Sequence, residues 1–335
     1  MDAMNTIKGL PPRWARAGRA AMAATMAGLV LGLVLARPHV AAAQGRQTPS
    51  YQGAQSIPPN PEYSALFSLL YPGVGQIYNG DPLTGIAHMG SYTALVSNYF
   101  RGTEHPDYIL PQNRYDGVNN IIHTNRQTFE TDFYGQTAFN VNLYSIYAAY
   151  RDARQHPGNL RGYSTPPPQE SLGDVFIAPF RPSLLARPTT FLPLLLPLYI
   201  ATQKPTREDL VIVPDNTITR TELRRGYFLE HWGVAIGEEA FFRGYVNNGL
   251  SDWWGEGWGL AGSSVLFGLA HSGNPGQATG GGAFLYGLYL GWLHQRNDYD
   301  MSQGIAIHFW WNFLVSVAFT NEREKVVAIP LYITF

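Results

Sequence analysis

Residues 237–246, with the sequence GEEAFFRGYV, place three charged side chains in a run of aromatic and small residues. Charges in such apolar surroundings are costly unless they are paired or take part in chemistry. Glu239 and Arg243 stand four residues apart, so a helix places them on one face as a pair. Glu238 lies about 100° further around the helix and has no cation nearby in the sequence. We therefore assign Glu239 and Arg243 to structural support and expect a chemical function for Glu238.

Two further apolar segments each carry polar side chains at helical spacing. The sequence SSVLFGLAH ends with Phe267 and His271 four residues apart, and IAIHFWWNF holds His308 and Asn312 four residues apart. Residues at this spacing share one face of a helix. Helical bundles build their sites from polar side chains that point inward from several helices. We therefore expect Glu238 to meet these polar groups in the core of a bundle.

Taken in order, the three motifs Glu-Glu-x-x-x-Arg, Phe-x-x-x-His and His-x-x-x-Asn resemble those of the CPBP family, also called ABI. This family contains the CAAX prenyl endopeptidases and their bacterial intramembrane relatives. The resemblance implies a membrane metalloendopeptidase whose functional residues fall on Glu238, His271, His308 and Asn312. It also implies that Glu239 and Arg243 support them.

We expect an all-α, polytopic membrane bundle with an additional N-terminal membrane hairpin, and the composition is typical of membrane helices. Of the 335 residues, 45% are hydrophobic and only 14% are charged, against about 25% charged in an average soluble protein. Abundant glycine and aromatic residues are typical of packed membrane helices. The mean hydropathy of −0.14 counts against a bundle that is hydrophobic throughout. A net charge of −1 gives no reason to expect nucleic acid, and without cysteine any metal needs histidine and carboxylate ligands.

The chain divides by composition into five parts. Residues 1–43 have the basic, apolar and small-residue regions of an export signal, although the apolar run could instead remain as a membrane anchor. Residues 44–62 form a polar linker. Residues 63–154 hold a hairpin broken by Pro72-Gly73 and Gly80-Asp81-Pro82, then a polar loop over 102–131, then an amphipathic helix suited to a membrane interface. Residues 155–205 form a linker and a proline-kinked apolar segment, and 206–335 form the catalytic helical core.

The residue types suggest hydrolysis by an activated water. Burial in an apolar helix raises the pKa of a carboxylate, which makes Glu238 a suitable general base. His271 could share the water, and His308 with Asn312 could donate hydrogen bonds to the oxyanion. The alternative for His271 is a buried ring that is satisfied by a backbone carbonyl. We place the other histidines, His231 among them, at the surface or interface, and His294 at the polar end of a helix.

Zinc is a separate question. Glu238, His271 and His308 would provide three ligands and leave one open position, as catalytic zinc requires. The same residues also suit a water that is activated by Glu238 without metal.

We expect an endopeptidase that cleaves a peptide or protein substrate at or within the bilayer, in contact with membrane lipid. An exported N-terminus suggests the inner membrane of a bacterium. The main alternative is a non-catalytic membrane scaffold or immunity-type binding protein with the same fold, and a weaker one is a soluble periplasmic peptidase.

Overall fold

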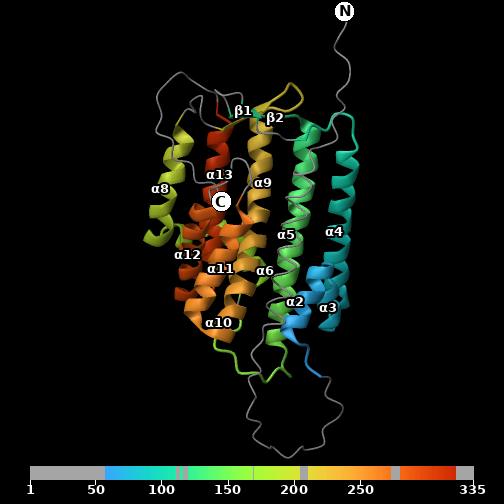
Figure 1. Cartoon of the computed structure of the whole chain (residues 1–335), viewed down its shortest axis with the longest axis vertical. Helices are drawn as coiled ribbons and strands as arrows, with labels where there is room; N and C mark the ends of the chain where they lie inside the picture. The colour runs from blue at the N-terminus through green and yellow to red at the C-terminus, as the bar shows by residue number, and fades with distance from the viewer. Residues whose placement is uncertain are drawn as a thin grey trace, which may run out of the picture. The chain divides into compact units, whose positions relative to one another are not determined.

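The computed structural model describes most of the chain downstream of its N-terminal segment, namely residues 57–110, 114–115, 120–168, 170–203, 210–272 and 280–321. All of these residues belong to a single compact unit. The predicted export signal lies outside the described residues, as does most of the predicted linker. The described residues are mostly helical (Figure 1), which confirms the predicted all-α class in outline.

The N-terminal helices are α2 (Pro61–Leu70), α3 (Val74–Tyr78), α4 (Pro82–Thr103) and α5 (Arg126–Gln155). A second group of shorter helices follows, namely α6 (Leu172–Ile177), the 3₁₀ segment η1 (Ala178–Phe180), α7 (Pro182–Leu185) and α8 (Pro188–Thr202). The last group comprises α9 (Arg220–Glu239), the π-helical segment η2 (Ala240–Asn247), α10 (Asn248–Trp254), α11 (Glu256–Ala270), α12 (Gly280–Arg296) and α13 (Ser302–Phe319).

The predicted hairpin breaks are present. Gly73 separates α2 from α3 with a φ of +95°, and a Cβ atom there would meet the carbonyl oxygen of Gly85 at 2.1 Å. Only glycine fits such a left-handed, crowded position. Asp81 then caps α4 by accepting a hydrogen bond from the Thr84 amide, with Pro82 at the first helical position. The sequence therefore folds back twice within a few residues.

A small sheet, which the all-α prediction lacked, aligns helices α5 and α9. It contains β1 (Arg114–Tyr115), β2 (Asn120–Thr124) and β3 (Leu210–Pro214) in the order β1-β2-β3. β1 and β2 are antiparallel, whereas β2 and β3 are parallel. β2 leads into α5 and β3 leads into α9, so these two helices start from the same sheet and run side by side (Figure 1).

The contact between α5 and α9 keeps one register over most of its length. Cβ atoms added at Gly226, Gly237 and Gly244 would overlap Phe129, Asn140 and Tyr147, respectively. Each glycine therefore lets a bulkier side chain of α5 approach the backbone of the α9–η2 rod. Such close approach needs a residue without a side chain. As a result, α5 supports the helix that carries Glu238.

Two predictions for this region were wrong. The expected polar loop over residues 102–131 contains the end of α4, the strands β1 and β2 and the start of α5. The helix expected at an interface is instead packed against α2, α4 and α9, and much of its second half is buried. Polar side chains such as Asn140 and Arg154 are buried along this helix. The sequence pattern therefore resembled that of an amphipathic surface helix, although the helix lies in the core.

Within the described part of the chain, no helix is both long and apolar enough to cross a membrane. The kinked apolar segment forms α8, with Pro193 and Pro197 inside the helix. It packs against α13 and exposes several large apolar side chains, Phe191 and Leu192 among them. The polytopic membrane arrangement therefore stays a prediction.

Candidate active site

The four predicted catalytic residues come from three helices. Glu238 lies at the end of α9, His271 caps the C-terminus of α11, and His308 and Asn312 lie one turn apart on α13. Their exposed fractions are 7%, 5%, 0% and 5%, respectively. All four side chains are therefore shielded from bulk solvent.

The supporting pair forms as predicted and has an additional partner. Arg243 Nη1 lies 3.1 Å from Glu239 Oε1, and both side chains are fully buried. The same oxygen accepts a hydrogen bond of 2.8 Å from Nδ1 of His308. Gly304 gives the carboxylate room, since a Cβ there would come within 2.9 Å of Glu239 Oε2. The pair thus stabilises the core and also fixes the ring of His308.

A widened helical turn begins directly after this carboxylate. Residues 240–247 form the π-helical segment η2, where the sequence predicted a regular helix. π-helical turns are rare and occur frequently at functional sites. The wider turn keeps Arg243 against Glu239 and also places its guanidinium 4.5 Å from the ring centre of Phe267. The first and second motifs therefore meet through this cation–π contact.

Both histidines direct their Nε2 atoms toward Glu238. His271 Nδ1 lies 2.8 Å from the carbonyl oxygen of Phe267, which can only accept, so Nδ1 carries the proton. His308 Nδ1 is held in the same way by Glu239. Glu238 Oε2 lies 3.5 Å from Nε2 of His271 and 3.8 Å from Nε2 of His308. A carboxylate oxygen and two imidazole nitrogens therefore converge, and in neutral rings these nitrogens are acceptors.

This convergence includes buried atoms that lack partners. Glu238 Oε2 and His308 Nε2 are buried and make no hydrogen bond within the described residues. The alternative interpretation of His271, a buried ring that is satisfied by a backbone carbonyl, is correct for Nδ1, which bonds to Phe267. It does not account for Nε2, which faces Glu238. One water can donate two hydrogens, so a water at this point would satisfy two of the three acceptors.

The two adjacent carboxylates, Glu238 and Glu239, are both buried, but their pKa values shift in opposite directions. Burial raises the pKa of Glu238 from 4.5 to about 7, an effect that the charge of His308 partly offsets. Burial alone would also raise the pKa of Glu239, but Arg243 and the hydrogen bond from His308 hold that pKa below its ordinary value. Glu239 is thus the fixed anion, and Glu238 can exchange a proton near neutral pH.

Asn312 is placed near this group but is not tied to it. Its Oδ1 atom is buried and has no hydrogen-bond partner in the described residues. The residue lies one helical turn beyond His308 on α13. Its amide oxygen is therefore available to a ligand.

The predicted zinc ligands have suitable chemistry, but the described residues do not show them arranged as a metal site. Neutral imidazoles whose other nitrogen is bound to oxygen are the usual zinc ligands, and a carboxylate completes such sets. In the part of the chain that the structure describes, however, no group of three or more histidine, aspartate or glutamate side chains is arranged to hold a metal ion. We therefore derive no chemical step through zinc.

Two histidines that we predicted at the surface or at the polar end of a helix are more buried than expected. His294 is 2% exposed, and its Nε2 lies 2.8 Å from Asn248 Oδ1. His231 is half-buried, and both of its ring nitrogens are buried without a partner in the described residues. Burial and nearby His308 lower the pKa of His231 to about 3. Its position seven residues before Glu238, on the same face of α9, was the available signal.

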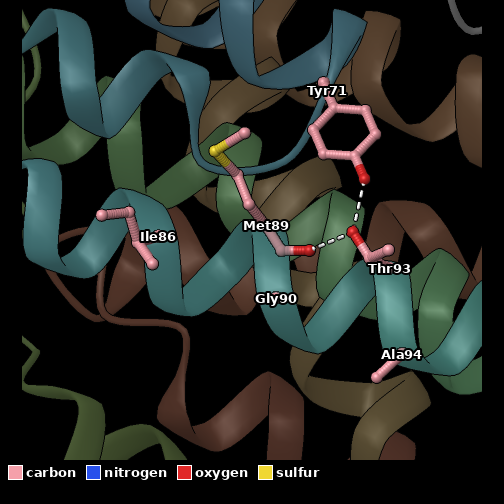
Figure 2. A pocket seen from close by; sticks show the side chains of 6 residues that line it. All are labelled: Tyr71, Ile86, Met89, Gly90, Thr93 and Ala94. Carbon is pink, nitrogen blue, oxygen red and sulfur yellow. Dashed lines mark hydrogen bonds between the residues drawn. The ribbon is translucent and has the colours of Figure 1, made fainter.

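A pocket of about 610 Å³ lies elsewhere, where α4 meets Tyr71 at the end of α2 (Figure 2). Its only polar side chains are Tyr71 and Thr93, whose hydroxyl oxygens lie 2.6 Å apart. It contains none of the motif residues.

The fold and the site define a helical protein that buries a carboxylate, two imidazoles and an amide in one region. Residues 226–314 match the family model described as type II CAAX prenyl endopeptidase Rce1-like. This match spans all three motifs and confirms the predicted resemblance to the CAAX prenyl endopeptidases over this part of the chain. The proteins of this family are endopeptidases and membrane proteins. The match therefore supports, in general terms, the predicted protease activity and the predicted membrane location. No curated protein and no solved structure matches the chain.

Proposed function

We propose that the chain is an endopeptidase in which Glu238 activates a water molecule for attack on a peptide bond. One observation carries this proposal: Glu238 Oε2 is buried without a hydrogen-bond partner among the described residues, 3.5 Å and 3.8 Å from the Nε2 atoms of His271 and His308. Three convergent acceptors leave a need for hydrogen-bond donors, and water supplies them.

In the proposed reaction, the ionised Glu238 accepts a proton from this water while the oxygen attacks the substrate carbonyl. The Nε2 atom of one of the two imidazoles accepts a hydrogen bond from the second hydrogen, which stays on the oxygen, and so orients the water. A pKa of about 7 lets Glu238 accept a proton near neutral pH and then return it to the leaving amine. The amine departs with that proton as the C–N bond breaks, so protons and electrons balance.

The oxyanion needs hydrogen-bond donors, and Asn312 is better suited to this role than His308. His308 already donates from Nδ1 to Glu239, so its Nε2 donates only when the ring is doubly protonated. The amide nitrogen of Asn312 is a donor at any pH, and its oxygen is not engaged elsewhere in the described residues. We therefore assign Asn312 as the oxyanion donor and His308 as a residue that orients the water.

The substitution Glu238→Gln tests the proposal, because it keeps the size of the side chain and removes the base. Purified full-length protein in detergent should fold normally but lose cleavage of a quenched peptide by at least about 10³-fold, within the range of general-base effects. Glu230→Gln is the matched control, since Glu230 is on the same helix and burial also raises its pKa, to about 8. Wild-type cleavage by the Glu238→Gln protein would refute the proposal and favour the scaffold alternative.

Zinc dependence stays a separate prediction with its own measurement. If Glu238, His271 and His308 bind zinc after rearrangement, dialysis against a chelator should abolish cleavage, and added zinc should restore it. Unchanged cleavage after metal removal, verified by elemental analysis, would leave a water activated by Glu238 alone.

The substrate and location follow from the family only in general terms. We propose a peptide or protein substrate cleaved close to a membrane, with lipid as a neighbour of the enzyme. Large apolar side chains exposed on α8 support contact with lipid. The bacterial inner membrane and an exported N-terminus remain part of this proposal.

A further inference from the structure

The register of α9 against α13 brings an additional histidine to the site. At one end of this antiparallel pair, Arg224 Nε donates a hydrogen bond of 2.9 Å to Thr320 Oγ1. At the other end, Glu239 lies against Gly304. His231 is eight residues before Glu239, and Asn312 is eight residues after Gly304. His231 is therefore level with Asn312 across the helix pair.

His231 has a packing partner for its ring but no hydrogen-bond partner for its nitrogens in the described residues. The ring stacks on Tyr227 with centres 5.8 Å apart and planes inclined by 16°. Both nitrogens are buried and make no hydrogen bond in the described residues. A buried polar atom without a partner costs about 1–3 kcal/mol. Folding alone thus gives no reason for an imidazole at this position.

Comparison with His294 shows what a structural histidine in this fold looks like. His294 is 2% exposed and its Nδ1 has no hydrogen-bond partner in the described residues, but its Nε2 lies 2.8 Å from Asn248 Oδ1, whereas neither nitrogen of His231 has a partner there. The unpartnered nitrogens of His231 instead resemble the unpartnered atoms of Glu238 and Asn312. All three residues lie on the α9–α13 pair: His231 and Glu238 are seven residues apart on one face of α9, and His231 is level with Asn312 on α13.

We propose that His231 is a substrate-binding residue that hydrogen-bonds the peptide backbone of the substrate beside the bond to be cleaved. A neutral imidazole has one donor and one acceptor. A peptide group offers the matching carbonyl and N–H. In this arrangement a substrate strand lies along α9, with its scissile carbonyl near Asn312 and the next peptide group at His231. The inference rests on the proposed endopeptidase function.

The test compares His231→Phe with His231→Gln in the full chain. Phenylalanine keeps the stacking on Tyr227 and removes both nitrogens, whereas glutamine retains a donor and an acceptor. His88→Phe is the matched control, because His88 stacks on Tyr144 in the same way, at 6.1 Å and 27°, within the N-terminal hairpin region. The probe is a quenched peptide selected from a mixed-sequence library for cleavage by the wild type.

We expect His231→Phe to raise KM about 3- to 10-fold, the effect of about one lost hydrogen bond, with kcat nearly unchanged. His231→Gln should recover much of this loss, and His88→Phe should match the wild type. An unchanged KM for His231→Phe, with Glu238→Gln inactive, overturns the inference while the proposed function stands. If His231→Phe does not fold, a KM for His231→Gln that is more than about 10-fold higher than that of the wild type also overturns it.

A wrong proposed function would give a different set of cleavage results. In that case the wild type and Glu238→Gln would cleave the library equally, or neither would cleave it. Either result removes the substrate to which His231 is proposed to bind and therefore overturns both proposals.

Discussion

Two buried polar clusters in this protein differ in how completely their atoms are paired. In the N-terminal hairpin region, Gln76 Nε2 donates to the carbonyl oxygen of Ser145 at 2.9 Å. Its Oε1 accepts from the hydroxyl groups of Ser68 and Ser145 at 3.1 Å and 3.2 Å. In the candidate active site, by contrast, Glu238 and Asn312 each have a buried oxygen with no hydrogen-bond partner in the part of the chain that the structure describes.

The comparison separates polar groups that hold the fold from polar groups that await a ligand. A satisfied network stabilises one packing arrangement, whereas each unsatisfied buried group destabilises the folded state. Gln76 therefore has the contacts of a packing residue. The unpartnered atoms near Glu238 are better explained by a water or substrate that completes them.

The largest expected effect in this comparison concerns Asn312. Asn312→Ala removes the proposed oxyanion donor, and loss of one such donor lowers kcat about 10²–10³-fold. Its Oδ1 atom has no partner in the described residues, so the melting temperature should change little. Steady-state kinetics and thermal unfolding of the same preparation measure both quantities. A stable variant with wild-type kcat would contradict the role of Asn312.

The next effect is a pH dependence of stability that originates in Glu238. Its pKa rises from 4.5 to about 7 on folding, so folding favours the protonated form. This contribution is fully present below pH 4.5 and is lost as the pH rises through about 7. The decrease in the free energy of unfolding should amount to about 2–3 kcal/mol between pH 5 and pH 8.

Denaturant unfolding of the wild type and of Glu238→Gln at several pH values isolates this term. The variant lacks the ionisable group, so its stability relative to the wild type should increase with pH. Glu230→Gln should remove a separate decrease centred nearer pH 8. Parallel pH profiles for the wild type and Glu238→Gln would show that Glu238 is not protonated by burial.

The smallest effect is expected in the satisfied cluster. Gln76→Leu leaves the hydroxyl of Ser68 and the carbonyl of Ser145 without their partner and should lower the free energy of unfolding by about 1–3 kcal/mol. Cleavage by the folded variant should remain unchanged, because Gln76 is not one of the site residues. Loss of activity at unchanged stability would remove the distinction between the two clusters.

Local spacing along the chain determined part of this structure. The four-residue separation of Glu239 and Arg243 predicted their ion pair, and glycine and proline at residues 72–73 and 80–82 predicted the hairpin breaks. The three motifs also identified the family from single helix faces. These inferences succeed because helical periodicity and turn chemistry act over only a few residues.

Only the tertiary structure decided which faces meet. The parallel β2–β3 pair sets α5 against the rod that carries Glu238, and no spacing within either helix encodes this pairing. The antiparallel register of α9 and α13 likewise brings His231 level with Asn312 and ties His308 to Glu239. Contacts between residues that are far apart in the sequence depend on how whole helices pack, so a histidine assigned to the surface from its own segment alone can line the site.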